Sequence, residues 1–487
     1  MNHRTMSIVP AVLLMFATTT FAWAQQAPPP PPPATPPPPP DAAIAHQDVA
    51  PAPQIFLKEP ASAMFAHSKV TLINFIEFDA FHDSTQTYQD SFGGPIVRSN
   101  TYGGQHGREN FLARNSQFGL QVDGPEFWGM KPGAHCRMDF MGQQPGTPQN
   151  GTSEYSFTNS ATMRLFHCFG YMNTPYVDVM GGITYSLLGN EPFFFPASLT
   201  FLPIPGMTFT RTVQFRLSHQ FSTPHIDFFI GAAAGRPPQR DAEVPDGIGA
   251  LRIGFNDWKG AHTIGAVGLR IDPLSIGVSG LMRTFRVQER AVNPTSSNTE
   301  NGAAISLDAF IPIIPAKALT DTGNTMAGTV DFTTGYGFSD AVSSNTTAGI
   351  PAQTRLAAPG AAPGAAAPAQ LDIDPGIAIY DSQGFLHAVK WQSIQFGLQY
   401  RLPGPGNLWI YGNYAYLKSD NIATLLPPKP GAVSTIFKNQ AFVSAGLGWA
   451  IIPNFQVGFE YSKLDQTFLD EGTETNHRFS FATYYIY

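Results

Sequence analysis

Charged side chains are scarce in this sequence. They make up 13% of its 487 residues, whereas soluble globular proteins carry roughly 25%. The formal net charge of −7 is mild and gives no support to nucleic-acid binding. We therefore expect neither an ordinary soluble domain nor a nucleic-acid partner.

Long apolar runs are also missing. After the first 24 residues, no stretch reaches the about 18–20 consecutive apolar residues that a membrane helix needs. Aromatic residues nevertheless make up 12% of the chain, and phenylalanine alone contributes 38 of them. Such a composition is typical of a membrane β-barrel, in which apolar residues occupy every second position of many strands.

Cysteine is almost absent. The two cysteines exclude a disulfide-dense fold and a cysteine-type zinc site. They fall in consecutive expected strands at about the same position along the barrel axis, so a disulfide bridge between them is conceivable. Alternation, however, places Cys136 on the face of Met138 and Cys168 on the opposite face, with Arg164. Because opposite faces cannot be bridged without distortion, we expect two free thiols.

The first residues of the chain have the layout of a secretory signal peptide. A basic start with Arg4 precedes an apolar core and a small-residue site ending at Ala24, so residues 1–24 are expected to be removed. Residues 25–66 are rich in proline and are expected to be an extended or disordered periplasmic linker. This linker is either a stiff spacer that contacts the cell wall or a tail without a specific partner.

From Val70 onward the pattern has a period of two. The segments "FQVGFEYSKL" (455–464) and "SIQFGLQYRL" (393–402) alternate apolar residues with polar residues or glycine. This alternation recurs over more than 400 residues. It predicts an all-β fold, a transmembrane antiparallel β-barrel over residues 67–487 whose polar face lines the interior.

The connections between the expected strands alternate in length. Short turns such as 173–176 and 452–454 alternate with long loops such as 84–108 and 340–386, as in barrels with short periplasmic turns and long external loops. Seventeen strand-like segments can be counted, whereas both ends in the periplasm require an even number. We interpret residues 261–288 as one strand plus part of an external loop, which gives about 16 strands.

Several segments resemble the DcaP-like trimeric outer-membrane porins. The similarity is carried by "VTLINFIEFDAFHDS" (70–84), "LARNSQFGLQV" (112–122), "ATMRLFHCFGYM" (161–172) and "GGITYSLLGNEPFFFP" (181–196). The resemblance implies a sixteen-stranded homotrimer in the outer membrane that passes small, often anionic solutes by diffusion. Gln117 and Phe166 stand where the family tends to have basic residues, which weakens the expectation of anion preference.

Selectivity in a diffusion channel requires charges that face the lumen. Alternation directs a set of charged residues inward, because charge at mid-strand on the lipid face costs roughly 2–4 kcal/mol. We expect most of them to pair across the wall. The residues predicted to line the pore are Glu77, Asp79, Arg137, Asp139, Arg164, Asp178 and Arg216.

The segment 187–206 is too apolar for an ordinary exposed loop. It holds four prolines and the run Phe193–Phe195, which preclude a regular strand. We expect it to fold into the barrel and narrow the pore, with Glu191 and Phe193 at the constriction. Packing at a trimer interface is the alternative.

No enzyme motif is present in the sequence. It has no Gly-x-Ser-x-Gly, His-Glu-x-x-His or phosphate-binding glycine loop, so we expect no enzymatic activity, no cofactor and no metal. A passive porin is the predicted function. A structural or adhesive barrel, linked to the cell wall through the proline-rich segment, is the alternative.

The chain ends on an alternating aromatic strand, "NHRFSFATYYIY". We expect its odd-numbered residues to face outer-membrane lipid and its even-numbered residues to face the lumen. A terminal aromatic strand also resembles the signal that the outer-membrane assembly machinery recognises. The residues predicted to form this signal are Phe479, Phe481, Tyr485 and Tyr487.

Overall fold

The computed structural model describes residues 68–87, 92–142, 161–190, 193–200, 203–239, 242–357 and 369–487. All of them belong to one unit of the chain, residues 59–487. The expected signal peptide, 1–24, and proline-rich linker, 25–66, lie outside the described residues. So does Glu191.

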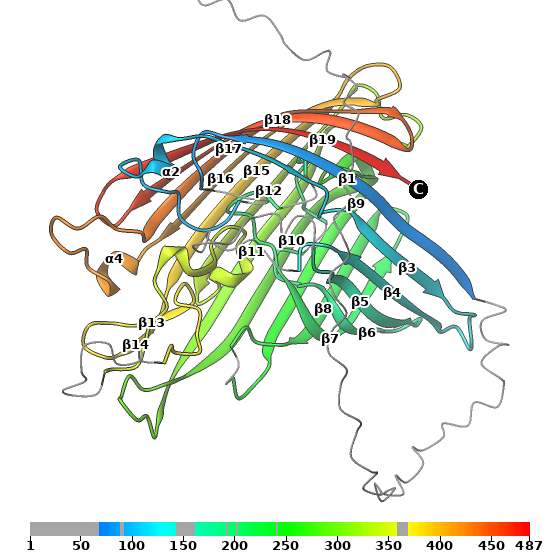
Figure 1. Cartoon of the computed structure of the whole chain (residues 1–487). Helices are drawn as coiled ribbons and strands as arrows, with labels where there is room; N and C mark the ends of the chain where they lie inside the picture. Colours follow the sequence, from blue (N-terminus) through cyan, green and yellow to red (C-terminus); the bar gives the residue numbers. More distant parts are fainter. Residues whose placement is uncertain are drawn as a thin grey trace, which may run out of the picture. The chain divides into compact units, whose positions relative to one another are not determined.

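Antiparallel strands form one closed sheet (Figure 1). Apart from β2 and β3, which both pair with β1, each strand of the sheet pairs with the next one along the chain, and the last strand pairs with the first, so that Glu77 lies opposite Tyr484. The strands are β1 (Lys69–Asp83), β2 (Arg108–Leu112), β3 (Gln117–Asp123), β4 (Lys131–Asp139), β5 (Arg164–Asn173), β6 (Asp178–Tyr185), β7 (Arg211–Ser222), β8 (Ile226–Gly235), β9 (Asp246–Ile264), β10 (Gly268–Gln288), β11 (Ser297–Ile314), β12 (Thr325–Tyr336), β15 (Lys390–Arg401), β16 (Leu408–Ser419), β17 (Phe437–Ile452), β18 (Phe455–Phe468) and β19 (Thr473–Ile486).

The sheet makes 16 crossings of the barrel wall. β2 and β3 both pair with β1, the first along residues 79–83 and the second along residues 69–75, so they are one crossing with an interruption. The interruption falls at Asn115 and Ser116, where Asn115 donates a 2.7 Å hydrogen bond to Glu77 Oε2. The predicted strand number is therefore confirmed.

The interpretation of residues 261–288 was wrong in its detail. Residues 246–264 and 268–288 form two long paired strands, β9 and β10. The turn between them lies at the short-turn end of the barrel and is not part of a long loop. The sequence "IDPLS" does not break the strand; the pairing only shifts in register between Pro273 and Leu274.

Outward-facing residues form an apolar surface around the barrel. Along β19, odd-numbered residues lie outside and even-numbered ones inside, as predicted. A closed barrel with such a surface satisfies every backbone group while it faces lipid. Exposed members of this surface include Ile76, Phe78, Phe215, Leu217, Ile230, Leu251, Ile305, Leu307, Phe396, Leu398, Ile410, Val443, Phe459, Phe479 and Tyr485.

The cysteines form a disulfide, so the expectation of two free thiols was wrong. Cys136 and Cys168 lie directly opposite each other in β4 and β5. The pairing passes from Arg137–His167 to Met138–Leu165, which leaves Phe166 as an extra residue in β5. This bulge shifts the alternation between Arg164 and Cys168 by one place, and both cysteines consequently face outward.

The loops at the long-loop end carry short elements of their own. These are the helices α2 (Tyr102–Gln105) and α4 (Ile422–Leu425), the 3-10 turns η1 (Ser339–Ala341) and η2 (Thr346–Gly349), and the hairpin β13 (Ala378–Tyr380) and β14 (Leu386–Ala388). Among the described residues, no helix is long and apolar enough to cross a membrane.

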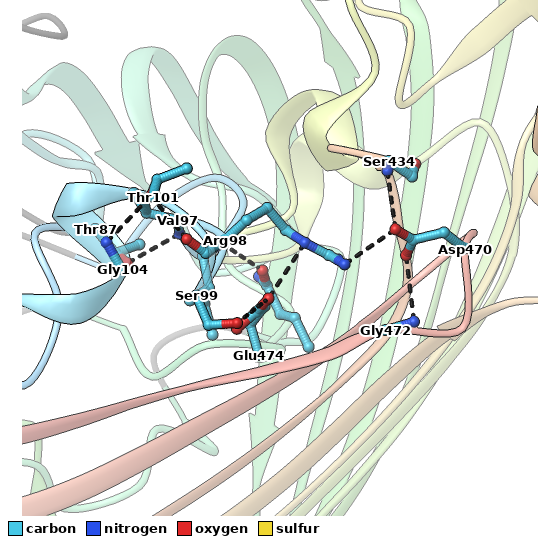
Figure 2. A network of polar contacts seen from close by, with 12 residues as sticks. Thr87, Val97, Arg98, Ser99, Thr101, Gly104, Ser434, Asp470, Gly472 and Glu474 are labelled. Carbon is cyan, nitrogen blue, oxygen red and sulfur yellow. Dashed lines mark hydrogen bonds and ion pairs between the residues drawn. The ribbon is translucent and has the colours of Figure 1, made fainter. Parts of the chain in front are cut away.

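An ionic network fastens the first long loop to the last hairpin (Figure 2). Arg98 pairs with Asp470 at 3.0 Å and with Glu474 at 3.2 Å. Burial acts to raise the pKa of Asp470, but hydrogen bonds from the N–H groups of Ser434 and Gly472 and the charge of Arg98 lower it overall. The network holds residues 92–107 against the β18–β19 turn.

Candidate functional site in the barrel lumen

The segment 187–206, here called the crossing loop, runs through the lumen. Its Leu199 reaches the far wall, where its N–H donates to Glu460 Oε2 at 3.1 Å and its carbonyl accepts from the Tyr484 hydroxyl at 2.6 Å. Tyr411 donates to the same Glu460 oxygen at 2.8 Å. These wall residues come from β16, β18 and β19, whereas the loop begins after β6. Its apolar sequence is explained by this position inside the barrel.

Further contacts fix the start and end of the crossing loop. Gly189 N–H donates to Ser279 Oγ at 2.8 Å, and Asn190 donates to Asp308 at 3.1 Å. Just after the loop, Thr208 donates to Asp331 at 3.0 Å. The loop is thus held along its length by inward-facing polar groups of β10, β11 and β12.

The predicted acids of the wall are placed inside the barrel, but in structural contacts. Glu77 is fully buried between Asn115 and Tyr484, and Asp79 is fully buried two positions further along β1. Asp178, at the start of β6, lies 3.6 Å from the His219 ring. The structure does not bring these three acids together at one constriction.

Asp139 and Arg164 form a pair across neighbouring strands. The Arg164 guanidinium donates to both carboxylate oxygens of Asp139, at 3.0 and 2.5 Å. The Asp139 side chain is 0% exposed and that of Arg164 is 32% exposed. This bidentate geometry is typical of a structural ion pair between neighbouring strands. Arg164 therefore contributes less net charge to the lumen than its position alone implies.

The guanidinium groups of Arg216 and Arg137 make different contacts in the lumen. Arg216 donates to the Tyr185 carbonyl and to Gln214, which holds it along the wall. Arg137 lies over the Phe166 ring at 4.9 Å and lines a cavity of about 460 Å³ in the lumen. Of the arginines that the sequence placed at the pore, Arg137 is the one that faces this cavity.

The cavity lies between the wall and the inserted segments. Its other lining residues include Asn74 of β1, Tyr185 of β6, Phe195 of the crossing loop and Arg270 of β10. Two guanidinium groups therefore border one apolar-walled space. Arg270 is also paired with Asp272 at 2.9 Å.

Phe193 contacts two arginines, Arg252 and Arg270, that were not predicted at the constriction. The guanidinium of Arg252 lies 3.8 Å above the Phe193 ring, and that of Arg270 lies 5.4 Å away. Such cation–π contacts fix both the ring and the charges. Nothing in the sequence linked Arg252 or Arg270 to Phe193.

The lumen is packed unevenly. Inward residues of β15 and β16 such as Trp391 and Leu417 are completely buried against an apolar core that includes Ile204, Phe338 and Val342. Several inward residues of β4 to β7 instead stay partly exposed, among them His135, Arg137, Phe169, Arg164 and Arg216, although Asp139, His167 and Gln214 of the same strands are buried. Water-accessible space therefore follows the β4–β7 wall.

In the part of the chain that the structure describes, no group of three His, Cys, Asp or Glu side chains could hold a metal ion. The aspartates of "LDIDPG", which superficially suggest a calcium loop, include Asp374, whose Oδ1 accepts hydrogen bonds from Gly376 N–H at 2.7 Å and Thr347 N–H at 3.1 Å. This is the turn chemistry expected of such a sequence.

A scan against protein-family models and a search of curated proteins find no match to this sequence. Among solved structures, the chain is similar to the outer membrane channel DcaP of Acinetobacter baumannii, with 15% identity, 87% of this chain and 98% of DcaP covered, and a TM-score of 0.59. An anion-selective porin from Comamonas acidovorans matches with 10% identity, 86% and 100% coverage and a TM-score of 0.48. OmpT, an outer membrane protein of Vibrio cholerae, matches with 10% identity, 86% and 98% coverage and a TM-score of 0.44. The chain thus shares the fold of the DcaP channel, and the resemblance drawn from the sequence is confirmed at the level of the fold.

Proposed function

We propose that this protein is an outer-membrane porin, a passive channel through which small hydrophilic solutes diffuse without enzymatic turnover. In this proposal the short turns face the periplasm and the long loops face outward. The crossing loop narrows the passage, which runs between the loop and the β4–β7 wall. A homotrimer embedded in outer-membrane lipid is proposed from the resemblance to trimeric porins.

The observation that carries the proposal is the partly exposed, arginine-lined side of the lumen. Arg137 and Arg270 border the same cavity, Arg270 as a partner of Asp272, while Asp139 on this wall is neutralised by Arg164. A positive potential in a narrow, low-dielectric passage favours anions. We therefore propose a preference for small anionic solutes, with dicarboxylates as one candidate class.

A structural or adhesive barrel is the second candidate. It is favoured by the apolar core that fills the opposite side of the lumen, in which Phe338, Trp391 and Phe437 are completely buried. A barrel so filled does not need a pore in order to be stable. In this case the proline-rich residues 25–66 would link the barrel to the cell wall.

Liposome swelling separates the two functions. Purified protein is reconstituted into liposomes, which are diluted into isotonic glycerol, arabinose or a disaccharide. A porin gives swelling that is fastest for the smallest solute and slower for the larger ones. Swelling no faster than that of protein-free liposomes, for every solute, would contradict the channel and support the structural barrel.

A further inference from the structure

The β9–β10 hairpin is longer than the barrel wall at its position. Pairing of β8 with β9 ends at Phe255, and pairing of β11 with β10 ends at Ser275. The two strands nevertheless stay paired with each other to Ile264 and Gly268. Residues 256–273, here called the hairpin tip, therefore project beyond the wall at the short-turn end.

The hairpin tip folds into the lumen and reaches the opposite wall. Ala266 is buried in a cluster with Phe75, Trp409 and Tyr484, whose side chains face inward from β1, β16 and β19. β9 and β10 lie half a barrel away from β1 and β19 in the strand order. The tip consequently spans the lumen, as the crossing loop does.

The two inserted segments are joined to each other. Gly265 N–H donates to the Pro196 carbonyl at 3.0 Å, and Ser198 N–H donates to the Gly265 carbonyl at 3.4 Å. Gly265 has a φ of +56°, a left-handed conformation that glycine adopts without strain. Each segment thus donates one backbone hydrogen bond to the other.

The wall holds the tip on the other side. Gln399 of β15 accepts from Thr263 N–H at 2.7 Å and donates to the Thr263 carbonyl at 3.3 Å. Arg401 donates to Thr263 Oγ1 at 3.0 Å. Specific side-chain bonds of this kind indicate a defined docked position in the lumen.

His262 lies at the centre of this docking and is completely buried. Its ring stacks on Phe310 at a centroid distance of 4.3 Å. Its Nε2 is 2.8 Å from the Phe195 carbonyl of the crossing loop, and its Nδ1 is 2.8 Å from Asp272 Oδ2. A carbonyl can only accept a hydrogen bond, so Nε2 must carry a proton.

Asp272 Oδ2 also accepts a hydrogen bond from Arg270 Nε at 3.1 Å, and the Arg270 guanidinium lies 2.9 Å from the same oxygen. His262 therefore connects the crossing loop with an ion pair of the tip, so that one side chain fixes the two segments relative to each other.

We propose that the hairpin tip is a second constriction element of the channel, which enters from the short-turn end and is held against the crossing loop through His262. His262 is a positioning residue. The inference rests on the proposed channel function. It adds that the width of the passage is set by two segments that enter the lumen from opposite ends of the barrel.

The first experiment removes the tip from the full-length protein. Residues 258–272 are replaced by Gly-Gly-Ser, and unitary conductance is recorded in planar bilayers. We expect a larger unitary conductance than in the wild type. An unchanged conductance in a folded variant would overturn the second constriction while leaving the channel itself intact.

The second experiment keeps the tip and removes the ring that holds it. His262→Ala deletes the contact with the Phe195 carbonyl, and we expect a larger unitary conductance than in the wild type. His477→Ala is the matched control, because His477 lies on the outward face of β19 and bonds Tyr461, and it should leave the conductance unchanged.

The outcomes distinguish the two proposals. If the wild type and all variants show no conductance, the channel function itself fails. If the wild type, the tip deletion and His262→Ala all conduct equally, only the second constriction fails. A larger conductance in the tip deletion and in His262→Ala, with His477→Ala unchanged, supports the second constriction.

Discussion

The Tyr484 hydroxyl lies 2.8 Å from Glu77 Oε1 and 2.6 Å from the Leu199 carbonyl. One buried side chain of the last strand thus connects the first strand, where the barrel closes, with the segment that crosses the lumen. The closure of the wall and the position of the crossing loop depend on the same hydroxyl group.

Removing that hydroxyl tests the connection. Tyr484→Phe leaves Glu77 and the Leu199 carbonyl short of a buried donor, which should lower the free energy of unfolding by about 1–3 kcal/mol. The change is measured by urea unfolding in detergent micelles. Tyr485→Phe, which alters an outward-facing residue exposed by 49%, is the control and should leave the midpoint unchanged. Equal midpoints for both variants would refute the buried contact.

The disulfide predicts the behaviour of the thiols. Protein unfolded without reductant should bind no thiol reagent, and it should bind two equivalents after reduction. Cys136→Ser with Cys168→Ser should lower the free energy of unfolding by about 2–4 kcal/mol, because the cross-link restricts the unfolded chain. Two reactive thiols before reduction would show that the bridge between β4 and β5 does not form.

Charge selectivity should depend on Arg137. Arg137→Gln removes a positive group from the lumen cavity and should shift the reversal potential in a salt gradient toward cations. A fall of about fivefold in the anion-to-cation permeability ratio corresponds to roughly 1 kcal/mol of Coulomb attraction. Arg236→Gln, at the exposed end of the β8–β9 loop, should change the ratio little. An equal effect of the two variants would mean that Arg137 has only a structural role.

The terminal aromatic residue should act in assembly before it acts in conduction. Tyr487 is 49% exposed and lies beside Tyr485 at a ring distance of 5.7 Å. Its deletion should reduce the amount of folded, heat-modifiable barrel in the outer membrane, whereas Tyr487→Phe should retain normal amounts. Barrel that does assemble without Tyr487 should conduct as the wild type does. Normal assembly of the deletion variant would exclude a role for Tyr487 as a recognition signal.

The alternation of apolar and polar residues was sufficient to predict the barrel. It assigned Glu77, Asp139 and Arg216 to the interior correctly, because an uninterrupted strand keeps its phase. It failed at Cys168, where the extra residue Phe166 shifts the phase inside β5. A bulge of this kind leaves no mark in the spacing of apolar residues, so the disulfide could not be predicted from alternation.

The candidate site was predictable in part for a different reason. The apolar composition of residues 187–206 indicated burial, and the contacts of Leu199 place the segment inside the barrel. Nothing in the sequence indicated that the hairpin tip enters the lumen, because its strands stay paired with each other after they leave the wall. Partners such as Phe193 and Arg252 come from distant strands, and only the three-dimensional arrangement joins them.

Recording in planar bilayers under a potassium chloride gradient tests the arginine-lined channel. The purified protein should insert as steady, uniform conductance steps, and the current should reverse at a potential displaced toward that of chloride, because Arg137 and Arg270 border the passage. Steady steps with a reversal potential on the potassium side would contradict the arginine-lined pathway. The absence of any steps would contradict the channel itself.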